Sequence, residues 1–262
     1  MSLCAQATLL SYSTVQKPHI LEITVDTLAR ALAAQRGGAH RIELCSDLSS
    51  GGITPSVELI RLTREQVRLP IFAMIRPRAG DYVYSGAEFA EMQREITAVG
   101  GTGVDGVVLG ILTGDGRVDV ERTRELVEQA RPLPVTFHRA FDVTTDLRES
   151  LEDVIQTGAA RILTSGGARS AFEGRAQLAE LVQQACGRVI IVPGAGITAA
   201  NAELVTRETR ACEFHAGLSS ANADGELDDE HFEEEVRKLA QALGESAAVR
   251  VRTNETDSGG AH

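Results

Sequence analysis

Cysteine is scarce in this sequence, and its spacing excludes several kinds of protein. The four cysteines among the 262 residues are Cys4, Cys45, Cys186 and Cys212, and no two of them form a CxxC pair. Such wide separation argues against a disulfide framework and against a structural zinc site. A dithiol redox centre is disfavoured for the same reason.

Positive charge and long apolar runs are also lacking. Lysine and arginine number 26 against 37 acidic residues, which gives a net charge of −11 and a pI near 5.1. An acidic surface argues against general binding to nucleic acids or to anionic membranes. No stretch approaches the roughly 20 apolar residues that span a bilayer, and the N-terminus shows no secretory signal pattern. We therefore expect a soluble, cytoplasmic protein.

From His19 onwards, short apolar runs alternate with longer amphipathic ones. The predicted strands are 20–25, 41–45, 71–75, 104–110, 135–137, 161–164, 189–192 and 212–215. Each is followed by a predicted helix, and these span 26–38, a segment beginning at 54–56, 86–99, 120–129, 146–157, 171–185, 199–206 and 229–243. Eight strand–helix units predict a single (β/α)8 barrel of the TIM type with parallel strands, and an open doubly wound sheet is the alternative.

The alternation also sets the expected boundaries of the domain. Residues 1–18 show no clear period and form a lead-in, residues 19–243 form the barrel, and residues 244–262 turn polar and are expected to be a disordered tail. The acidic run 228–235 resembles a cation site. Acidic residues in the first turn of a helix mainly offset its dipole, so we assign the run that role.

Polar residues at the carboxyl ends of the strands are the main functional signal, because a parallel barrel places its active site there. Side chains two residues apart share one face of a strand, which puts Glu22 with Thr24 and Glu43 with Cys45. If those faces point inward, two carboxylates and a thiol approach the barrel axis. The strands at 71–75, 135–137 and 212–215 end near further charged groups, namely Arg76, Arg78, His138, Arg139 and His215.

These groups support two interpretations. In the functional one, Arg76, Arg78 and Arg139 bind an anion, while the carboxylates and histidines, Glu22, Glu43, His138 and His215, perform acid–base catalysis. In the structural one, the same charges form a salt-bridge network that fills the barrel, since opposite charges lower each other's desolvation cost. The sequence leaves both open.

Glycines after the last three strands give a second signal. Ser165 and Gly166 follow the sixth strand, and Gly194 and Gly196 follow the seventh. Small residues let backbone N–H groups approach a ligand, and this region of such barrels often binds phosphate. We therefore place these four residues in a substrate site for a small anion, with tight turns as the alternative explanation.

Metal binding is a separate possibility. Cys45, His138 and His215 are suitable ligands for copper or zinc, although one thiolate with one or two imidazoles is a small set. Cys186 and Cys212 fall at the opposite end of the predicted barrel, where we expect them to serve in packing.

Taken together, the motifs resemble one family closely. They are RGGAHRIELC at 36–45, GGITPS at 51–56, MIRPRAGDYVYS at 74–85, PLPVTFHRAFD at 132–142, RILTSGG at 161–167, PGAGIT at 193–198 and EFH at 213–215. Over roughly residues 20–243 the chain resembles the CutC family, named as copper homeostasis proteins. The resemblance implies a TIM-type barrel, a cytoplasmic location, self-association into a dimer or tetramer, and a role in copper homeostasis with Cu(I) as the bound ion.

The chain departs from the family pattern at the thiols. Members proposed to hold Cu(I) carry a cysteine at the end of the first strand, where this chain has Thr24 and Val25, and some carry one after the EFH histidine, where it has Ala216. Cys45 is the one matching thiol and hence the predicted copper ligand. Since Cu(I) prefers several soft ligands, the alternative function is an enzyme acting on a small anionic, possibly phosphorylated, substrate.

Overall fold

The computed structural model describes residues 19–218 and 228–257, with side chains as far as Gly244. The predicted lead-in, residues 1–18, and the last residues of the predicted tail, 258–262, lie outside the described residues. No helix in the described ranges is both long and apolar enough to cross a membrane.

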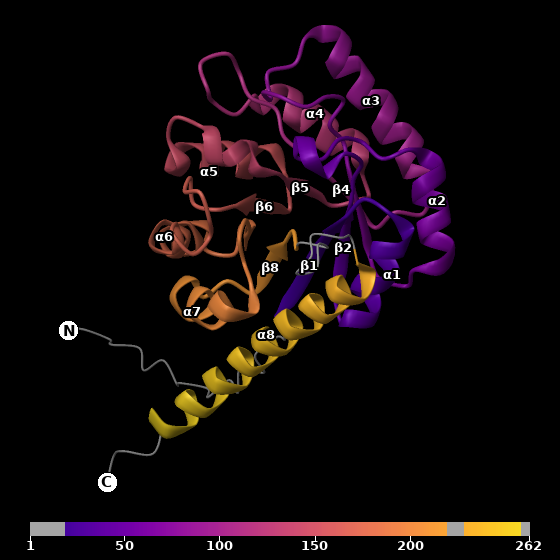
Figure 1. Cartoon of the computed structure of the whole chain (residues 1–262). Coiled ribbons are helices and arrows are strands. Elements are labelled where there is room, and N and C mark those ends of the chain that lie inside the picture. Colours follow the sequence, from indigo (N-terminus) through magenta and orange to yellow (C-terminus); the bar gives the residue numbers. More distant parts are fainter. Residues whose placement is uncertain (1–18, 219–227, 258–262) are drawn as a thin grey trace, which may run out of the picture.

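Eight parallel strands form the barrel, as the sequence predicts (Figure 1). Their bounds are β1 Ile20–Val25, β2 Arg41–Leu44, β3 Ile71–Met74, β4 Gly106–Leu109, β5 Val135–Phe137, β6 Arg161–Thr164, β7 Ile190–Pro193 and β8 Glu213–Ala216. Strands β1 to β7 pair one after another in chain order, and β8 pairs with β1. Within the described part of the chain no ladder joins β7 to β8. Pro193, which ends β7, has no N–H to donate to such a ladder.

The helices surround the strands on the outside (Figure 1). Their bounds are α1 Leu28–Gly37, α2 Val57–Gln66, α3 Gly86–Gly100, α4 Val120–Ala130, α5 Leu147–Thr157, α6 Arg175–Ala185, α7 Ala199–Thr209 and α8 Asp229–Asp257, with 3-10 turns η1 Leu48–Ser50 and η2 Arg139–Val143. Helix α8 packs on α1 and α7 and extends beyond the barrel (Figure 1).

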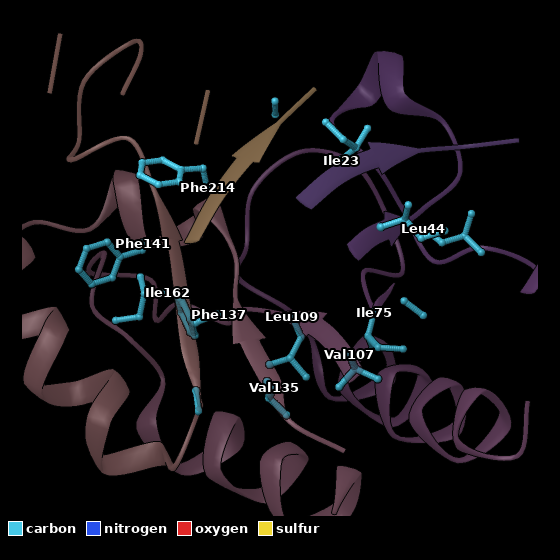
Figure 2. Close-up of a cluster of buried hydrophobic side chains, with 14 of the residues drawn as sticks. Ile23, Leu44, Ile75, Val107, Leu109, Val135, Phe137, Phe141, Ile162 and Phe214 are labelled. Atoms are coloured by element: carbon cyan, nitrogen blue, oxygen red, sulfur yellow. The ribbon is translucent and has the colours of Figure 1, made fainter. Parts of the chain in front are cut away.

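Strand side chains alternate between two different cores. The outward-facing ones, such as Ile23, Leu44 and Phe137, pack against the helices in one large apolar layer (Figure 2). The inward-facing ones form a much smaller apolar cluster of Cys45, Phe72, Met74 and Val108, and polar side chains fill the remainder of the barrel. The predicted parity is therefore confirmed by Glu22, Glu43 and His215, all of which are buried inside the barrel.

Helix starts differ from the predictions by a few residues. Thr27, not Asp26, caps α1 by accepting a hydrogen bond from the Arg30 N–H, and Ser56 caps α2, which begins at Val57. Helix α6 begins at Arg175 rather than at residue 171. A Cβ atom on Gly174 would lie 1.9 Å from the Ser165 carbonyl oxygen, so this segment first packs closely against the loop after β6.

The largest difference lies at the C-terminus, where a disordered tail after residue 243 was expected. Helix α8 continues through Gly244 to Asp257. One glycine inside a helix costs only about 1 kcal/mol relative to alanine, and the run that follows it contains no proline. Polarity alone was therefore insufficient evidence for disorder.

The contact between α1 and α8 depends on Gly37. A Cβ atom at this position would lie 2.7 Å from Val236 Cβ and 2.8 Å from the Glu233 carbonyl oxygen. We expect Gly37→Ala to lower the free energy of unfolding by about 1–3 kcal/mol, because the helices must move apart. Urea denaturation followed by circular dichroism measures the change. Gly100→Ala at the end of α3 is the control, since nothing lies within 4 Å of its added Cβ. Equal losses in the two variants would contradict the prediction.

Candidate functional site

A pocket of about 380 Å³ opens at the carboxyl ends of the strands. Seven of the predicted site residues line it: Glu43, Cys45, Arg76, His138, Arg139, Gly196 and His215. The other five, Glu22, Arg78, Ser165, Gly166 and Gly194, do not appear in its lining. The walls thus combine carboxylate, imidazole, guanidinium and thiol groups from strands far apart in the sequence.

One side of the pocket holds a chain of three buried ionisable groups. Strand pairing places Glu22 beside His215, and His215 Nδ1 lies 2.8 Å from Glu22 Oε1. On the other side of the ring, His215 Nε2 lies 3.8 Å from Glu43 Oε2. Glu43 Oε1 is buried and has no hydrogen-bond partner among the described residues. Among the three ionisable groups, Glu43 Oε1 is therefore the oxygen that is available to a ligand.

The three groups shift each other's pKa values in opposite directions. Burial opposes ionisation of Glu22, but the hydrogen bond with His215 and the charge of Arg41 outweigh it and lower the pKa of Glu22 to about 2. Burial and the nearby Glu22 raise the pKa of Glu43 despite His215. Burial disfavours the His215 cation, but Glu43 and Glu22 prevail and raise its pKa. Glu22 is thus an anion at neutral pH, whereas Glu43 holds a proton more readily than an ordinary carboxyl group does.

Below this chain lies a layer of ion pairs that the sequence analysis missed. Arg41 donates to Glu22 through Nε and to Glu213 through Nη2, the latter at 2.8 Å, and Arg161 Nε donates to Glu213 at 3.0 Å. The guanidinium carbons of Arg41 and Arg161 lie 4.8 Å and 5.0 Å from the centre of the Phe72 ring. None of these residues lines the pocket, and their ion pairs fit the structural interpretation of the charges.

The pKa of Glu22 makes acid stability a direct test of this arrangement. A carboxyl pKa of about 2, against 4.5 when unperturbed, stabilises the fold above pH 4.5, and the stabilisation is lost as pH falls toward 2. Its size is on the order of 3 kcal/mol. Urea denaturation across this range should therefore show a shallower pH dependence for Glu22→Gln than for the wild type. Glu43→Gln should keep the wild-type slope, because a raised pKa gives no slope below 4.5. Parallel curves for the wild type and Glu22→Gln would refute the assignment.

Just after β3, the strand beside that of Glu43, Arg76 contributes a buried cation to the pocket. Its guanidinium donates to the carbonyl oxygens of Ser50, Gly52 and Gly80, and it forms no ion pair with any described residue. The group lies 5.0 Å above the ring of Tyr82. A buried positive charge that only carbonyl dipoles and one aromatic ring compensate favours an anion in the adjoining pocket.

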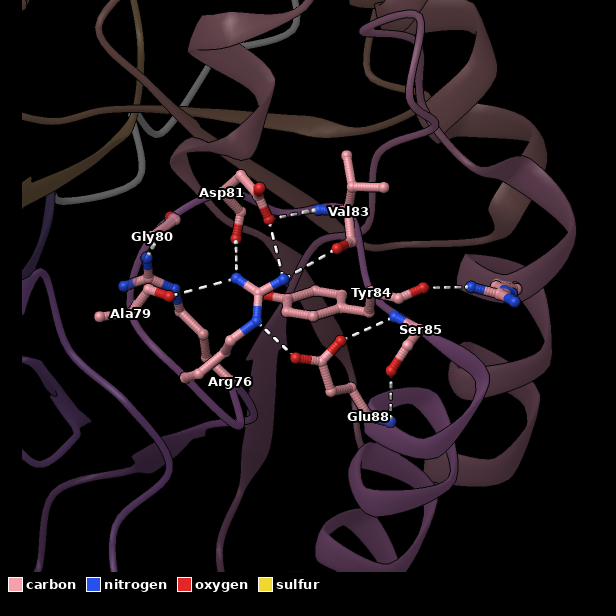
Figure 3. Close-up of polar contacts among 10 residues, drawn as sticks. Arg76, Ala79, Gly80, Asp81, Val83, Tyr84, Ser85 and Glu88 are labelled. Carbon is pink, nitrogen blue, oxygen red and sulfur yellow. Dashed lines mark hydrogen bonds and ion pairs between the residues drawn. The ribbon is translucent and has the colours of Figure 1, made fainter.

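The predicted cluster of three arginines over the carboxylates is not formed. Arg78 lies in the loop after β3, where it binds Glu88 and Asp81 and the carbonyl of Val83, and it does not line the pocket. Figure 3 shows how Asp81, Val83 and Glu88 lie close together there. Arg139 lines the pocket and is 43% exposed, with its Nε 2.8 Å from Asp142 Oδ2. The prediction places Arg76 and Arg78 in one cluster because they are close in the sequence, but the chain turns between them.

The predicted glycine loops contribute less lining than expected. Ser165 is buried and donates through Oγ to Ala168 O at 2.6 Å, and the Gly166 N–H donates to Thr164 Oγ1. A Cβ on Gly194 would lie 2.4 Å from Leu163 Cδ1, so that glycine serves packing. Gly196 does line the pocket, with φ +68. Of the four, only Gly196 stands where a ligand would touch it.

Cys45 is buried in the pocket wall and contacts Met74 in the inner apolar cluster. Burial and the charge of Glu43 raise the pKa of its thiol to about 12. The thiolate, which is the copper-binding form, is therefore disfavoured. Cys186 and Cys212 are exposed, so the packing role expected for them is wrong. Another possible metal-binding group is Glu22, Glu43 and His215, whose ligand atoms lie within 4.8 Å of one another, but these are hard or borderline ligands.

Comparison with known proteins gives the family. The model of the CutC family matches residues 19–221. The chain belongs to the CutC family. A relative from Chromobacterium violaceum, named a family protein CutC, is 43% identical over 241 residues, 86% of this chain and 98% of that protein. A human relative, named copper homeostasis protein cutC homolog, is 44% identical over 206 residues, 79% of this chain and 76% of that protein.

Solved structures agree with the CutC assignment. The CutC protein of Streptococcus agalactiae superposes with a TM-score of 0.72 at 31% identity, covering 76% of this chain and 98% of that one. Phosphoribosylanthranilate isomerase from Pyrococcus furiosus superposes with a TM-score of 0.55 at 16% identity, covering 85% and 99%, which shows a shared barrel fold alone. Every pocket residue of this CutC chain falls within the segment that the family model matches.

Proposed function

We propose that the pocket binds a small organic anion and catalyses proton transfer on it. The observation that carries this proposal is the pairing, in one pocket, of a buried cation, Arg76, with a buried carboxyl oxygen, Glu43 Oε1; neither has a charged or hydrogen-bonding side-chain partner within residues 19–218 and 228–244. Arg76 and the half-exposed Arg139 hold the anionic group of the substrate. Glu43 exchanges the proton, because its carboxyl group lines the pocket and burial raises its pKa.

His215 and Glu22 support this step. The Glu22 carboxylate holds the imidazole through Nδ1, which directs Nε2 toward Glu43. A protonated His215 stabilises the charge that appears on Glu43 when it is ionised, and so opposes the rise in the pKa of Glu43 that burial causes. The acid–base roles predicted for Glu22, Glu43 and His215 thus become an orienting anion, the proton acceptor and a bridging cation.

The experiment is a binding screen read by thermal shift and then by calorimetry. The probes are inorganic phosphate, pyruvate and dihydroxyacetone phosphate. We expect the wild type to bind at least one of them and Arg139→Ala to weaken that binding by about tenfold, the value of one charge-assisted contact. Arg169→Ala removes an arginine that is 90% exposed and outside the pocket, and should bind as the wild type does. Equal affinities in the two variants would contradict the proposal.

Copper ion binding is the second candidate, with copper as cargo. It is favoured by the contact of Cys45 and Met74 inside the pocket and by the copper homeostasis name of the human relative. One thiol with a pKa near 12 makes a poor Cu(I) chelator, so we rank it second. With it we propose the cytoplasmic location and the self-association that the family resemblance implies.

An anaerobic Cu(I) titration against a competing chelator separates the two candidates. If copper is the cargo, Cys45→Ala loses the ion and Arg139→Ala retains it. The double variant Cys186→Ala/Cys212→Ala is the control, since those exposed thiols bind copper without a pocket. Tight binding that only Cys45→Ala abolishes would place copper first.

A further inference from the structure

The imidazole of His138 is held in one orientation by contacts from several segments. Its Nδ1 accepts a hydrogen bond from the Ala140 N–H at 3.2 Å, and the Tyr82 ring lies 4.9 Å from it. Gly110 leaves the space for the ring, because a Cβ atom there would lie 2.6 Å from His138 Nδ1. A side chain fixed this closely presents the same atom to the pocket at all times.

The hydrogen bond from Ala140 also determines where the proton of His138 resides. A backbone N–H can only donate, so Nδ1 carries the lone pair and the ring proton is on Nε2. Nε2 is buried and has no partner among the described residues, although His138 lines the pocket. Burial and the charge of Arg76 lower the pKa of His138 to about 3, which agrees with a neutral ring. His138 therefore offers to the pocket a buried N–H donor that a ligand can use.

We propose that His138 Nε2–H donates to a carbonyl oxygen of the substrate, and that the substrates are small anionic aldehydes or ketones with a C–H bond next to the carbonyl. This inference rests on the proposed function, in which Glu43 exchanges the proton. It replaces the acid–base role predicted for His138, since a ring with its lone pair engaged by Ala140 cannot act as a base.

The reaction then balances without an oxidant or a cofactor. The C–H bond beside the carbonyl breaks and its proton moves to the Glu43 carboxylate. The electron pair forms a C=C bond, and the carbonyl π pair moves onto oxygen, where His138 Nε2–H and the positive charge of Arg76 stabilise it. Return of the proton to the same carbon gives hydrogen exchange or, where that carbon is a stereocentre, epimerisation. A neutral imidazole suits this task, because it stabilises the oxyanion without protonating it.

The test is exchange of the C–H hydrogens of pyruvate and dihydroxyacetone phosphate in D2O, followed by NMR. We expect wild-type exchange to fall by about 100- to 1,000-fold in His138→Leu, the usual cost of losing one oxyanion donor. His138→Gln, whose amide N–H can reach the same point, should recover part of the rate. Binding of inorganic phosphate should stay within about threefold of the wild type in both variants, since Arg76 and Arg139 are intact.

A second measurement separates a donor role from a structural one. In protein labelled with ¹⁵N at histidine, the two nitrogens of His138 should differ, with Nε2 protonated and Nδ1 not, and should stay so between about pH 5 and 8. Titration of this ring in that range would overturn the inference. If the probes bind but exchange equally fast in His138→Leu, the inference fails while the proposed function stands. If no anion binds in the pocket, both fail.

Discussion

Arg41→Met is expected to destabilise the barrel by about 3 kcal/mol or more, the largest effect on stability among the substitutions considered. Arg41 is buried and pairs with Glu22 and Glu213, both of which are buried as well. Methionine preserves much of the volume but leaves two carboxylates short of a cation in a site that water does not reach. Removing one partner of a buried ion pair costs far more than the pair contributes, because the remaining charge stays desolvated. Urea denaturation at neutral pH measures the loss.

Two controls make the Arg41 result specific. Arg36→Met removes an arginine of α1 that is 54% exposed and pairs with Glu233 on the surface, so its effect should be small. Adding Glu22→Gln to Arg41→Met removes one of the stranded charges and should restore part of the stability. If the double variant is less stable than Arg41→Met, the buried charge of Glu22 is not what makes the single substitution costly.

Glu43→Gln is expected to reduce turnover of an identified substrate by about 10²- to 10⁴-fold, the range of a lost general acid–base group. The amide has the shape of the carboxyl group but cannot accept the proton. Binding of the substrate should change only a few-fold, because Arg76 and Arg139 are retained, so the loss falls on kcat rather than on KM. Steady-state kinetics of both proteins with the same substrate give the comparison.

The matched control for Glu43 is Glu95→Gln. Glu95 is half-buried, and burial raises the pKa of its carboxyl group, as it does for Glu43. It accepts a hydrogen bond from Thr54 Oγ1 at 2.8 Å and does not line the pocket. A similar loss of turnover in both variants would mean that Glu43 acts through the fold and not on the substrate.

Local sequence signals were sufficient for the barrel and for one half of the pocket. Apolar runs located all eight strands, and the two-residue period placed Glu22 and Glu43 together on the face that proves to be the inner one. The same period puts Arg41 on the face of Glu43, but the prediction covers only polar residues at the carboxyl ends of the strands. Arg41 stands at the start of β2 and belongs to the layer beneath the pocket.

The rest of the site depends on contacts between distant segments, which no local pattern encodes. The donor role of His138 follows from the Ala140 N–H and from the space at Gly110, one strand away. Arg76 and Arg78 stand two residues apart in the sequence, yet one lines the pocket and the other ties its loop to Glu88. Tertiary packing, rather than residue type, decided between them.

The missing ladder between β7 and β8 bears on how this barrel can diversify. Leu163, Ala195, Gly196 and His215 line the pocket on either side of that seam. At any other junction, a wider opening would break several backbone hydrogen bonds, whereas between β7 and β8 no ladder forms among the described residues. Substitutions along this seam can therefore reshape the mouth for larger or smaller ligands while the remaining ladders keep their register, which makes it the natural place for substrate preference to evolve.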